Sequence, residues 1–436
     1  MKKIIIKFIE WFHLKIFGHP IGPEMKKFIV NLFWSTFGGG LAALIVLGVN
    51  VFAGRLMGPT EYGKYNLVLV VVNYLLVPIY FGLDIATIRA IAKSKDKKEA
   101  SKNISSAAPF IFCSLVVVLS ISLIFRRLFA GLFSTEVSLI NYALIFTIFM
   151  VFKNILDGYI RGIHSFKYQF IGRIIETCLI VSSFFLLFVF LKKDIYTSYL
   201  IVLASGASAI AIFYLIRLRS YFGKFNFQTL RNLLSHGKYF VINSALLTVF
   251  LSLDKLVINK YLDPFELGLY GAYYTASFTL ITQLSQMFNN VFFPSVAKNL
   301  SRAIFTKIEK LFLIGFAPMF IAVTLIVFVL VKLFGSKYGL YWSYVLIFGF
   351  MGTIQVAITV YGSIIMNFTK EVFRRYLWYY HLINLLTVIV YIILIYTAKV
   401  SILNISLALI INYILQVIVQ RELIKKNICD NVYANQ

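Results

Sequence analysis

The sequence predicts an all-α polytopic membrane protein, and three observations lead to this prediction. Hydrophobic residues make up 60% of the 436 residues and charged residues only 14%, which is far from the balance of a soluble domain. Apolar runs of about 18 to 25 residues, the length of a helix that crosses the hydrocarbon core, recur along the chain. In addition, one short motif occurs in both halves, which indicates an internal duplication.

The apolar runs define about twelve transmembrane helices, six in each half of the chain. In order, they are expected at residues 28–53, 66–91, 104–125, 136–156, 172–191, 196–216, 238–258, 268–294, 310–331, 341–364, 376–397 and 401–420. Because each half holds an even number of spans, both halves enter the membrane in the same direction. We therefore predict two six-helix bundles, at residues 25–217 and 238–420, related by a pseudo-two-fold axis along the membrane normal.

The net charge of +25 is explained by membrane topology. With both termini in the cytoplasm, most Lys and Arg residues fall on the inner segments, and this asymmetry sets orientation in the cytoplasmic membrane. A linker at residues 218–237 and a tail at residues 421–436 are then cytoplasmic. The basic loops Lys93–Lys102 and Arg217–Lys238 then face anionic lipid of the inner leaflet, so membrane lipids are expected partners and nucleic acid is not. Residues 1–24 predict an amphipathic helix at the membrane surface.

The repeated motif is Pro-x-Glu-x-Gly-x-Tyr, found at Pro59–Tyr65 and again at Pro264–Tyr270, an offset of 205 residues. Each copy occupies a short polar break between two apolar stretches, which places both copies on the outer face. Proline, an acidic first turn and glycine favour a tight entry into a helix, so the motif indicates structure rather than catalysis. Gly58–Lys64 matches a phosphate-binding loop only in part, because Tyr65 replaces the residue that holds magnesium. ATP is therefore not expected.

Polar side chains recur at helical spacing on three predicted spans, so each set lies on one helix face. Span 7 carries Ser244, Thr248, Ser252, Lys255 and Asn259; span 8 carries Thr275, Thr279, Thr282, Gln286 and Asn289; span 12 carries Asn412, Gln416 and Gln420. Lipid cannot satisfy such a face. Two interpretations stay open: hydrogen bonds between helices, or a hydrated cavity for a hydroxyl-rich ligand. Candidate binding residues in these sets are Ser252, Thr282, Gln286 and Asn289.

Charged residues in or near the spans are costly and therefore informative. The candidate substrate-binding cations are Arg55, Arg89, Arg161, Lys255 and Lys260, and the candidate ion-coupling acids are Asp84, Glu176 and Asp254. For each residue alone, snorkelling or a structural ion pair is the simpler interpretation. Asp157 and Arg161, four residues apart, predict such a pair. Together, an excess of cations near a central cavity predicts a bound anionic group such as phosphate or pyrophosphate.

Several phrases of the sequence resemble the polysaccharide flippases of the O-antigen, Wzx-like type. They are Leu253–Tyr270 followed by Phe293–Ser295, Phe81–Asp84 with Arg89–Ala92, and Arg161–Gly162. The resemblance covers about residues 26–420. It implies membership of the superfamily that also contains multidrug and lipid-linked oligosaccharide exporters. It therefore implies a fold of two six-helix bundles and a mechanism of alternating access. It also implies transfer of a polyprenyl-(pyro)phosphate-linked oligosaccharide from the inner to the outer leaflet.

The residues and the resemblance together predict a flippase for lipid-linked oligosaccharide in cell-surface polysaccharide or glycan biosynthesis, not an enzyme. Glycosyltransferases or a polymerase of the same pathway are candidate partners. Two alternatives stay open: a cation-coupled multidrug exporter of the same superfamily, and a membrane glycosyltransferase or polymerase, which the short outer loops disfavour. No cofactor or metal is expected, because the five histidines and three cysteines show no ligand spacing.

Overall fold

The computed structural model describes residues 23–285, 302–366 and 368–434, and most of these residues are helical. The surface helix predicted at residues 1–24 lies almost entirely outside the described residues. The main helices are α2 (Pro23–Tyr80), α3 (Leu83–Lys93), α4 (Lys97–Ile124), α5 (Arg126–Leu132), α6 (Val137–Gly162), α7 (Phe166–Phe184), α8 (Tyr196–Leu218), α9 (Phe227–Tyr261), α10 (Pro264–Tyr274), α12 (Arg302–Phe334), α13 (Trp342–Ile365), α14 (Lys370–Tyr396) and α15 (Ile402–Ala434). Short π-helical segments, η1 (Phe185–Phe190) and η3 (Thr275–Thr279), extend α7 and α10, and the 3-10 turns η2 (Arg219–Tyr221) and η4 (Ser336–Tyr338) follow α8 and α12.

Ten described segments are long and apolar enough to cross a membrane. One of them, Gly40–Tyr80, contains a kink at Gly58, whose φ is 78°. It holds part of each of the first two predicted spans, and the second predicted span is interrupted at Phe81 and Gly82 and continues as α3. The eighth predicted span begins as α10 and η3, and its second half from residue 286 onward lies outside the described residues. The predicted polytopic helical fold is confirmed, and the chain is a multi-pass membrane protein.

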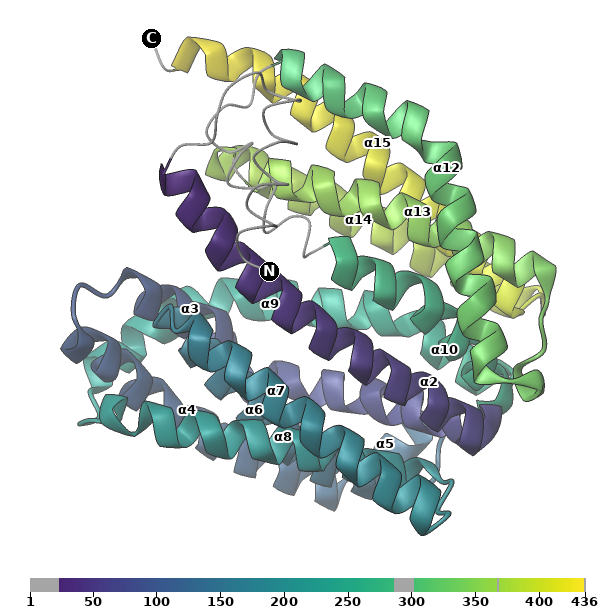
Figure 1. Ribbon diagram of the computed structural model, residues 1–436, viewed down its shortest axis with the longest axis horizontal. Coiled ribbons are helices and arrows are strands. Elements are labelled where there is room, and N and C mark those ends of the chain that lie inside the picture. The colour runs from purple at the N-terminus through teal and green to yellow at the C-terminus, as the bar shows by residue number, and fades with distance from the viewer. Residues whose placement is uncertain (1–22, 286–301, 367, 435–436) are drawn as a thin grey trace.

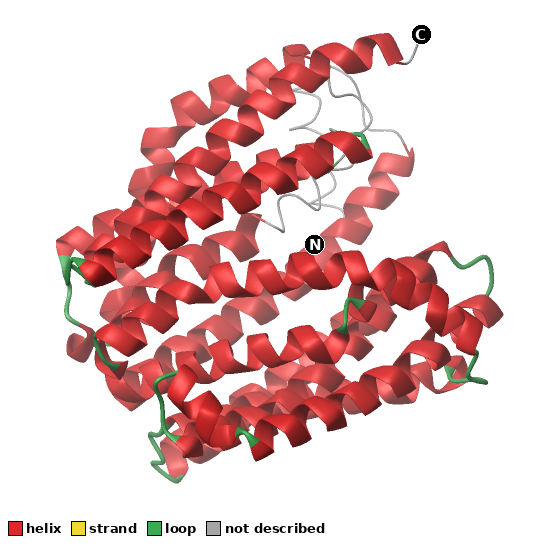
Figure 2. Ribbon diagram, turned by 180° about the vertical axis from the view of Figure 1, so that it is seen from behind, coloured by secondary structure: helices red, strands yellow, loops and turns green. Residues whose placement is uncertain are grey.

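The described helices form two lobes. In Figure 1, α4, α6, α7 and α8 gather in one lobe, α12, α13, α14 and α15 in the other, and α2 and α10 lie between them. Figure 2 shows the same separation from behind, with helices throughout the described part of the chain. Within the first lobe α7 packs on α8 and α2, and within the second α13 packs on α12 and α15.

Three predicted boundaries differ from the helix ends. The polar break around the first motif copy stays helical except at Gly58, because proline fits the first turn of a new helix and Pro59 begins one there. The predicted linker is largely helical, since α9 begins at Phe227 and the Asn226 side chain accepts a hydrogen bond from the backbone N–H of Thr229. The residues predicted as a tail continue α15 as far as Ala434.

The lobes touch where the two motif copies cross. A Cβ atom added to Gly63 would collide with the backbone of Pro264, and one added to Gly268 would collide with the backbone of Pro59. The duplicated register also appears in the loops that brace these helices. Tyr338 donates a hydrogen bond to the carbonyl of Gly54 at 2.7 Å. The offset of 205 residues relates Gly54 to Asn259 and Phe133 to Tyr338. At this equivalent position, Asn259 donates a hydrogen bond to the carbonyl of Phe133 at 3.1 Å.

Candidate functional site

A cavity of about 490 Å³ lies between the lobes. Its lining residues come from α2, α6 and α7 of the first lobe and from α9, α10 and η3 of the second. The polar and charged members are Asn50, Tyr62, Tyr65, Asn66, Asn73, Lys153, Arg173, Glu176, Thr177, Lys255, Tyr274, Thr275, Thr279 and Gln283. The volume is typical of a site for a small ligand or for one part of a larger one.

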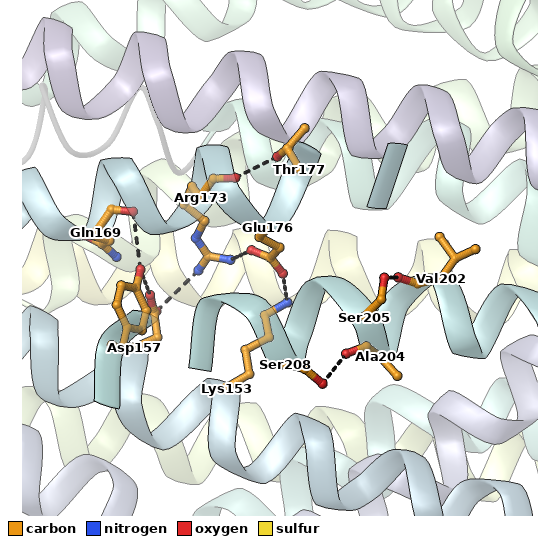
Figure 3. A network of polar contacts seen from close by, with 11 residues as sticks. Lys153, Asp157, Gln169, Arg173, Glu176, Thr177, Val202, Ala204, Ser205 and Ser208 are labelled. Carbon is orange, nitrogen blue, oxygen red and sulfur yellow. Dashed lines mark hydrogen bonds and ion pairs between the residues drawn. The ribbon is translucent and has the colours of Figure 1, made fainter. Parts of the chain in front are cut away.

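The first-lobe wall of the cavity carries a network of ion pairs between α6 and α7. Glu176 accepts from the Lys153 ammonium through one carboxylate oxygen and from Arg173 Nη1 through the other, at 2.9 Å for Arg173. Figure 3 shows the Arg173 guanidinium lying between Glu176 and Asp157, while Lys153 approaches Glu176 from the neighbouring helix. Both carboxylates of this network, Glu176 and Asp157, are thereby paired, as a buried charge requires.

Asp157 anchors the far side of this network. Its Oδ2 atom accepts from Arg173 Nη2 and from Arg161 Nε, both at 3.3 Å, and its Oδ1 atom accepts from the Tyr214 hydroxyl at 3.2 Å. The predicted ion pair between Asp157 and Arg161 is confirmed. Arg161 itself is half-exposed and is not among the lining residues of the cavity. Asp157 therefore positions Arg173, and Arg173 presents the charge to the cavity.

The second-lobe wall carries Lys255, which is placed differently. Its ammonium lies 4.5 Å from the centre of the Tyr274 ring, a cation–π contact, and donates to the carbonyl of Leu251 at 3.3 Å. Among the described residues, no carboxylate lies within salt-bridge distance of Lys255. In the part of the chain that the structure describes, the charged residues that line the cavity are Lys153, Arg173 and Lys255, which are cationic, and Glu176, which is anionic. These walls therefore carry net positive charge.

Asp254, the neighbour of Lys255 in sequence, points away into the second lobe. It is 3% exposed and accepts a hydrogen bond from the Tyr270 hydroxyl. Its Oδ1 atom has no hydrogen-bond partner among the described residues. A buried carboxylate with one unsatisfied oxygen is costly, so this oxygen is available to a proton or a cation.

The cavity floor is a hydrogen-bonded layer centred on Tyr62, which is fully buried. Its hydroxyl donates to Asn50 Oδ1 at 2.7 Å and lies 3.2 Å from the Thr275 hydroxyl of the other lobe. Asn50 in turn donates to the Tyr199 hydroxyl at 3.0 Å. This layer lies next to the motif crossing, because Tyr62 adjoins Gly63 in α2.

The candidate residues predicted from the sequence fall into separate groups. Lys255 and Glu176 line the main cavity, and Asp84 lines a second cavity of about 170 Å³ with Ser244 and Thr248. Seven candidates line neither cavity: Arg55, Arg89, Arg161, Ser252, Asp254, Lys260 and Thr282. Arg55 and Lys260 are exposed. The Arg89 guanidinium lies 4.7 Å from the centre of the Phe240 ring. Gln286 and Asn289 lie outside the described residues. A substrate or ion role for any of these residues stays a prediction.

The polar faces follow both interpretations that the sequence left open. Thr275 and Thr279 of the eighth span face the cavity. On the last span, Asn412 donates to Thr387 Oγ1 of α14 at 2.7 Å and accepts from Gln416, so that face joins two helices. Periodicity identifies a polar face, but it does not show whether a helix or water lies opposite.

Two lining cations, Lys153 and Arg173, are absent from the sequence-based candidates. The signal was present, because Lys153 lies within the predicted span at 136–156 and Arg173 within that at 172–191. A charge inside a span is by itself a candidate for function. The i, i+3 spacing of Arg173 and Glu176 and the i, i+4 spacing of Lys153 and Asp157 reinforce that signal.

Comparison with known proteins identifies the family. Residues 28–300 match the family described as "Polysaccharide biosynthesis protein". The chain belongs to this family. Its membership agrees with the resemblance seen in the sequence, and the matched region contains nearly all of the first lobe and both motif copies. No curated protein matches the chain.

Solved structures of membrane transporters share the fold of this family member. The lipid II flippase MurJ in an inward closed conformation is 16% identical, with a TM-score of 0.66, over 90% of this chain and 86% of that one. An inward-facing multidrug resistance MATE family transporter of the MOP superfamily is 12% identical, with a TM-score of 0.59, over 89% and 95%. A MOP superfamily transporter from Pyrococcus furiosus is 15% identical, with a TM-score of 0.59, over 93% and 96%. At these identities the likeness shows the fold.

Proposed function

We propose that this protein is a flippase that moves a polyprenyl-(pyro)phosphate-linked oligosaccharide across the membrane for polysaccharide or glycan biosynthesis. The observation that carries the proposal is a net positive cavity between the two lobes of a member of a polysaccharide biosynthesis family. MurJ, which shares the fold, is a flippase for lipid II. A lipid-linked sugar joins an apolar tail to a charged phosphate group, and a cationic cavity inside a membrane protein suits such a headgroup.

The phosphate group would bind between the two walls of the cavity. Arg173 and Lys153 reach it from the first lobe and Lys255 from the second, since all three line the same space. Arg173 can offer two parallel N–H donors to phosphate oxygens. Glu176 holds Lys153 and Arg173 in place until the phosphate competes for them. Thr275, Thr279 and the nearby amides offer hydrogen bonds to the sugar next to the phosphate.

A cation-coupled drug exporter is the alternative that shares this fold, as the MATE transporter illustrates. A drug that carries positive charge would have to bind against Lys153, Arg173 and Lys255, with Glu176 already paired to two of them. Like charges in a site of low dielectric repel strongly. The charge of the cavity therefore favours an anionic substrate over a cationic one.

An ion or proton at Asp254 would drive the cycle. This carboxylate is buried, carries one unsatisfied oxygen and lies next to Lys255 in the sequence of α9. Binding of a cation there would favour the lobe arrangement in which the site is best satisfied, which is how a ligand biases two states. The asymmetry of basic residues supports the cytoplasmic membrane, with both termini in the cytoplasm and the motif copies outside. Glycosyltransferases or a polymerase of the same pathway would act before or after it.

The test is transport in proteoliposomes that contain the purified, folded protein. A fluorescent sugar attached to a prenyl pyrophosphate should move between leaflets, and the variant Arg173→Met should slow this movement strongly. Lys307→Met, at an exposed position of α12, is the matched control and should transport at the native rate. Movement of organic cations in place of the pyrophosphate-linked sugar would reject the proposal and support the exporter.

A further inference from the structure

The crossing of the two motif copies is reciprocal. Gly63 lies against the carbonyl oxygen of Pro264, and Gly268 lies against the carbonyl oxygen of Pro59. An added methyl group at either glycine would overlap backbone atoms, which cannot turn aside as a side chain can. Glycine at both positions is therefore required for the helices to approach this closely.

The crossing lies directly beyond the floor of the cavity. Tyr62 of the floor adjoins Gly63 in α2, and Thr275 follows α10, the helix that carries Gly268. One turn further along, Asn66 fills the same place against Gly271, where an added Cβ would lie 2.5 Å from the Asn66 amide nitrogen. A molecule in the cavity is thus separated from the motif end by the Tyr62 layer and then by the glycine crossing.

We propose that this crossing is the closed gate at the motif end of the protein, held shut by the fit of two glycines rather than by ion pairs. Backbone contacts of this kind separate without leaving a buried charge unpaired, so the lobes can part and meet again. Each half of the duplicated chain supplies one glycine and one proline. Loss of either glycine therefore has the same consequence: the gate no longer closes fully. The gate adds to the proposed function, but its test requires no substrate.

The experiment measures access to the cavity from each side of the membrane. Thr279, which lines the cavity, is replaced by cysteine as a reporter. The background chain carries serine in place of Cys113, Cys178 and Cys429. A membrane-impermeant thiol reagent is added to intact cells or to inverted vesicles. Gly63→Ala and Gly268→Ala should each raise labelling from the motif side by about tenfold, the shift expected when one methyl group overfills a tight contact.

Gly48→Ala is the matched control, because Gly48 lies in the same helix α2 and an added Cβ there would have no atom within 4 Å. Its labelling should equal that of the parent. The two gate variants combined should raise labelling by less than the product of their separate effects, since both act on one contact. If Gly63→Ala lowers the melting temperature and leaves motif-side labelling unchanged, the crossing is a static contact and the proposal is overturned.

A milder variant covers the case in which the first two do not fold. In Gly271→Ala the three atoms nearest to the added Cβ belong to the side-chain amide of Asn66 and not to backbone, so this variant should raise motif-side labelling by a smaller factor. Adding Asn66→Ala removes that obstacle and should restore the parental rate. Unchanged labelling in folded Gly271→Ala would likewise overturn the proposal. Because labelling uses no lipid-linked sugar, this outcome is independent of whether the protein transports one.

Discussion

The two walls of the cavity handle charge in opposite ways. On the first-lobe wall, Lys153 and Arg173 share the carboxylate of Glu176, and Asp157 holds Arg173 from behind. On the second-lobe wall, Lys255 and Asp254 are neighbours in sequence but point apart, and among the described residues neither has an ion-pair partner. The first wall satisfies its charges internally, whereas the second leaves charges for a substrate or an ion to satisfy.

The largest effect is expected from breaking the paired wall. Glu176→Ala leaves Lys153 and Arg173 without their shared carboxylate, and removing one partner of a buried ion pair costs about 3–5 kcal/mol. The melting temperature of the purified protein in detergent should therefore fall sharply. Glu422→Ala, which removes an exposed carboxylate 3.6 Å from Arg421, is the control and should cost less than about 1 kcal/mol. Equal melting temperatures for the two variants would show that the first wall is not held by its ion pairs.

Lys255 on the unpaired wall should matter for binding and little for stability. Lys255→Met removes one charge-assisted hydrogen bond to a phosphate, worth about 1.5–3 kcal/mol, so the Kd for a prenyl pyrophosphate should rise at least about tenfold. Melting should stay close to native, because no carboxylate loses its partner. Lys255→Arg keeps the charge and should bind within a few-fold of native. An unchanged Kd in Lys255→Met would place the phosphate elsewhere.

Asp254 provides a second test of the difference between the two walls. Asp254→Asn keeps an oxygen that accepts from Tyr270 and removes a buried charge that has no ion-pair partner among the described residues. Stability should therefore change by no more than about 1 kcal/mol, whereas Glu176→Gln should be clearly destabilising. Transport in Asp254→Asn should lose its dependence on a cation or proton gradient, measured as flux with and without the gradient. A gradient dependence that survives this substitution would remove Asp254 from the coupling step.

The sequence predicted the fold well because a bilayer restricts the chain so strongly. Each span needs a long apolar helix, and an even number per half leaves one orientation for the duplicated units. The repeated motif likewise revealed the duplication. It did not reveal that Gly63 meets Pro264 and Gly268 meets Pro59, because a repeat shows that two segments are alike and not that they touch.

The candidate site was predicted only in part, and the reason is geometric. Lys255 and Glu176 were identified and line the cavity, but Arg55 and Lys260, chosen as cations at the ends of the first and seventh spans, are exposed. A helix end is close to the interface, where long cationic side chains reach water at little cost. In the observed helices, Lys153 of α6 and Arg173 of α7 lie well away from the helix ends, where a charge needs a partner, and both are paired with Glu176. Because the predicted span begins at residue 172, the sequence placed Arg173 at a span end, and its depth is visible only in α7.

The smallest effect is expected far from both walls, at the contact between α14 and α15. Thr387 accepts a hydrogen bond from Asn412, which also donates to Asn384 Oδ1 at 3.1 Å. Thr387→Val should cost about 0.6 kcal/mol, the average for hydrogen bonds between membrane helices, because Asn412 keeps its bond to Asn384. Thr397→Val, whose hydroxyl bonds only within its own helix end, controls for the change of side chain. A loss of transport in Thr387→Val with stability preserved would show that this polar face reaches the substrate path. The second lobe would then contain polar groups that bind substrate at two places, on the cavity wall and between α14 and α15.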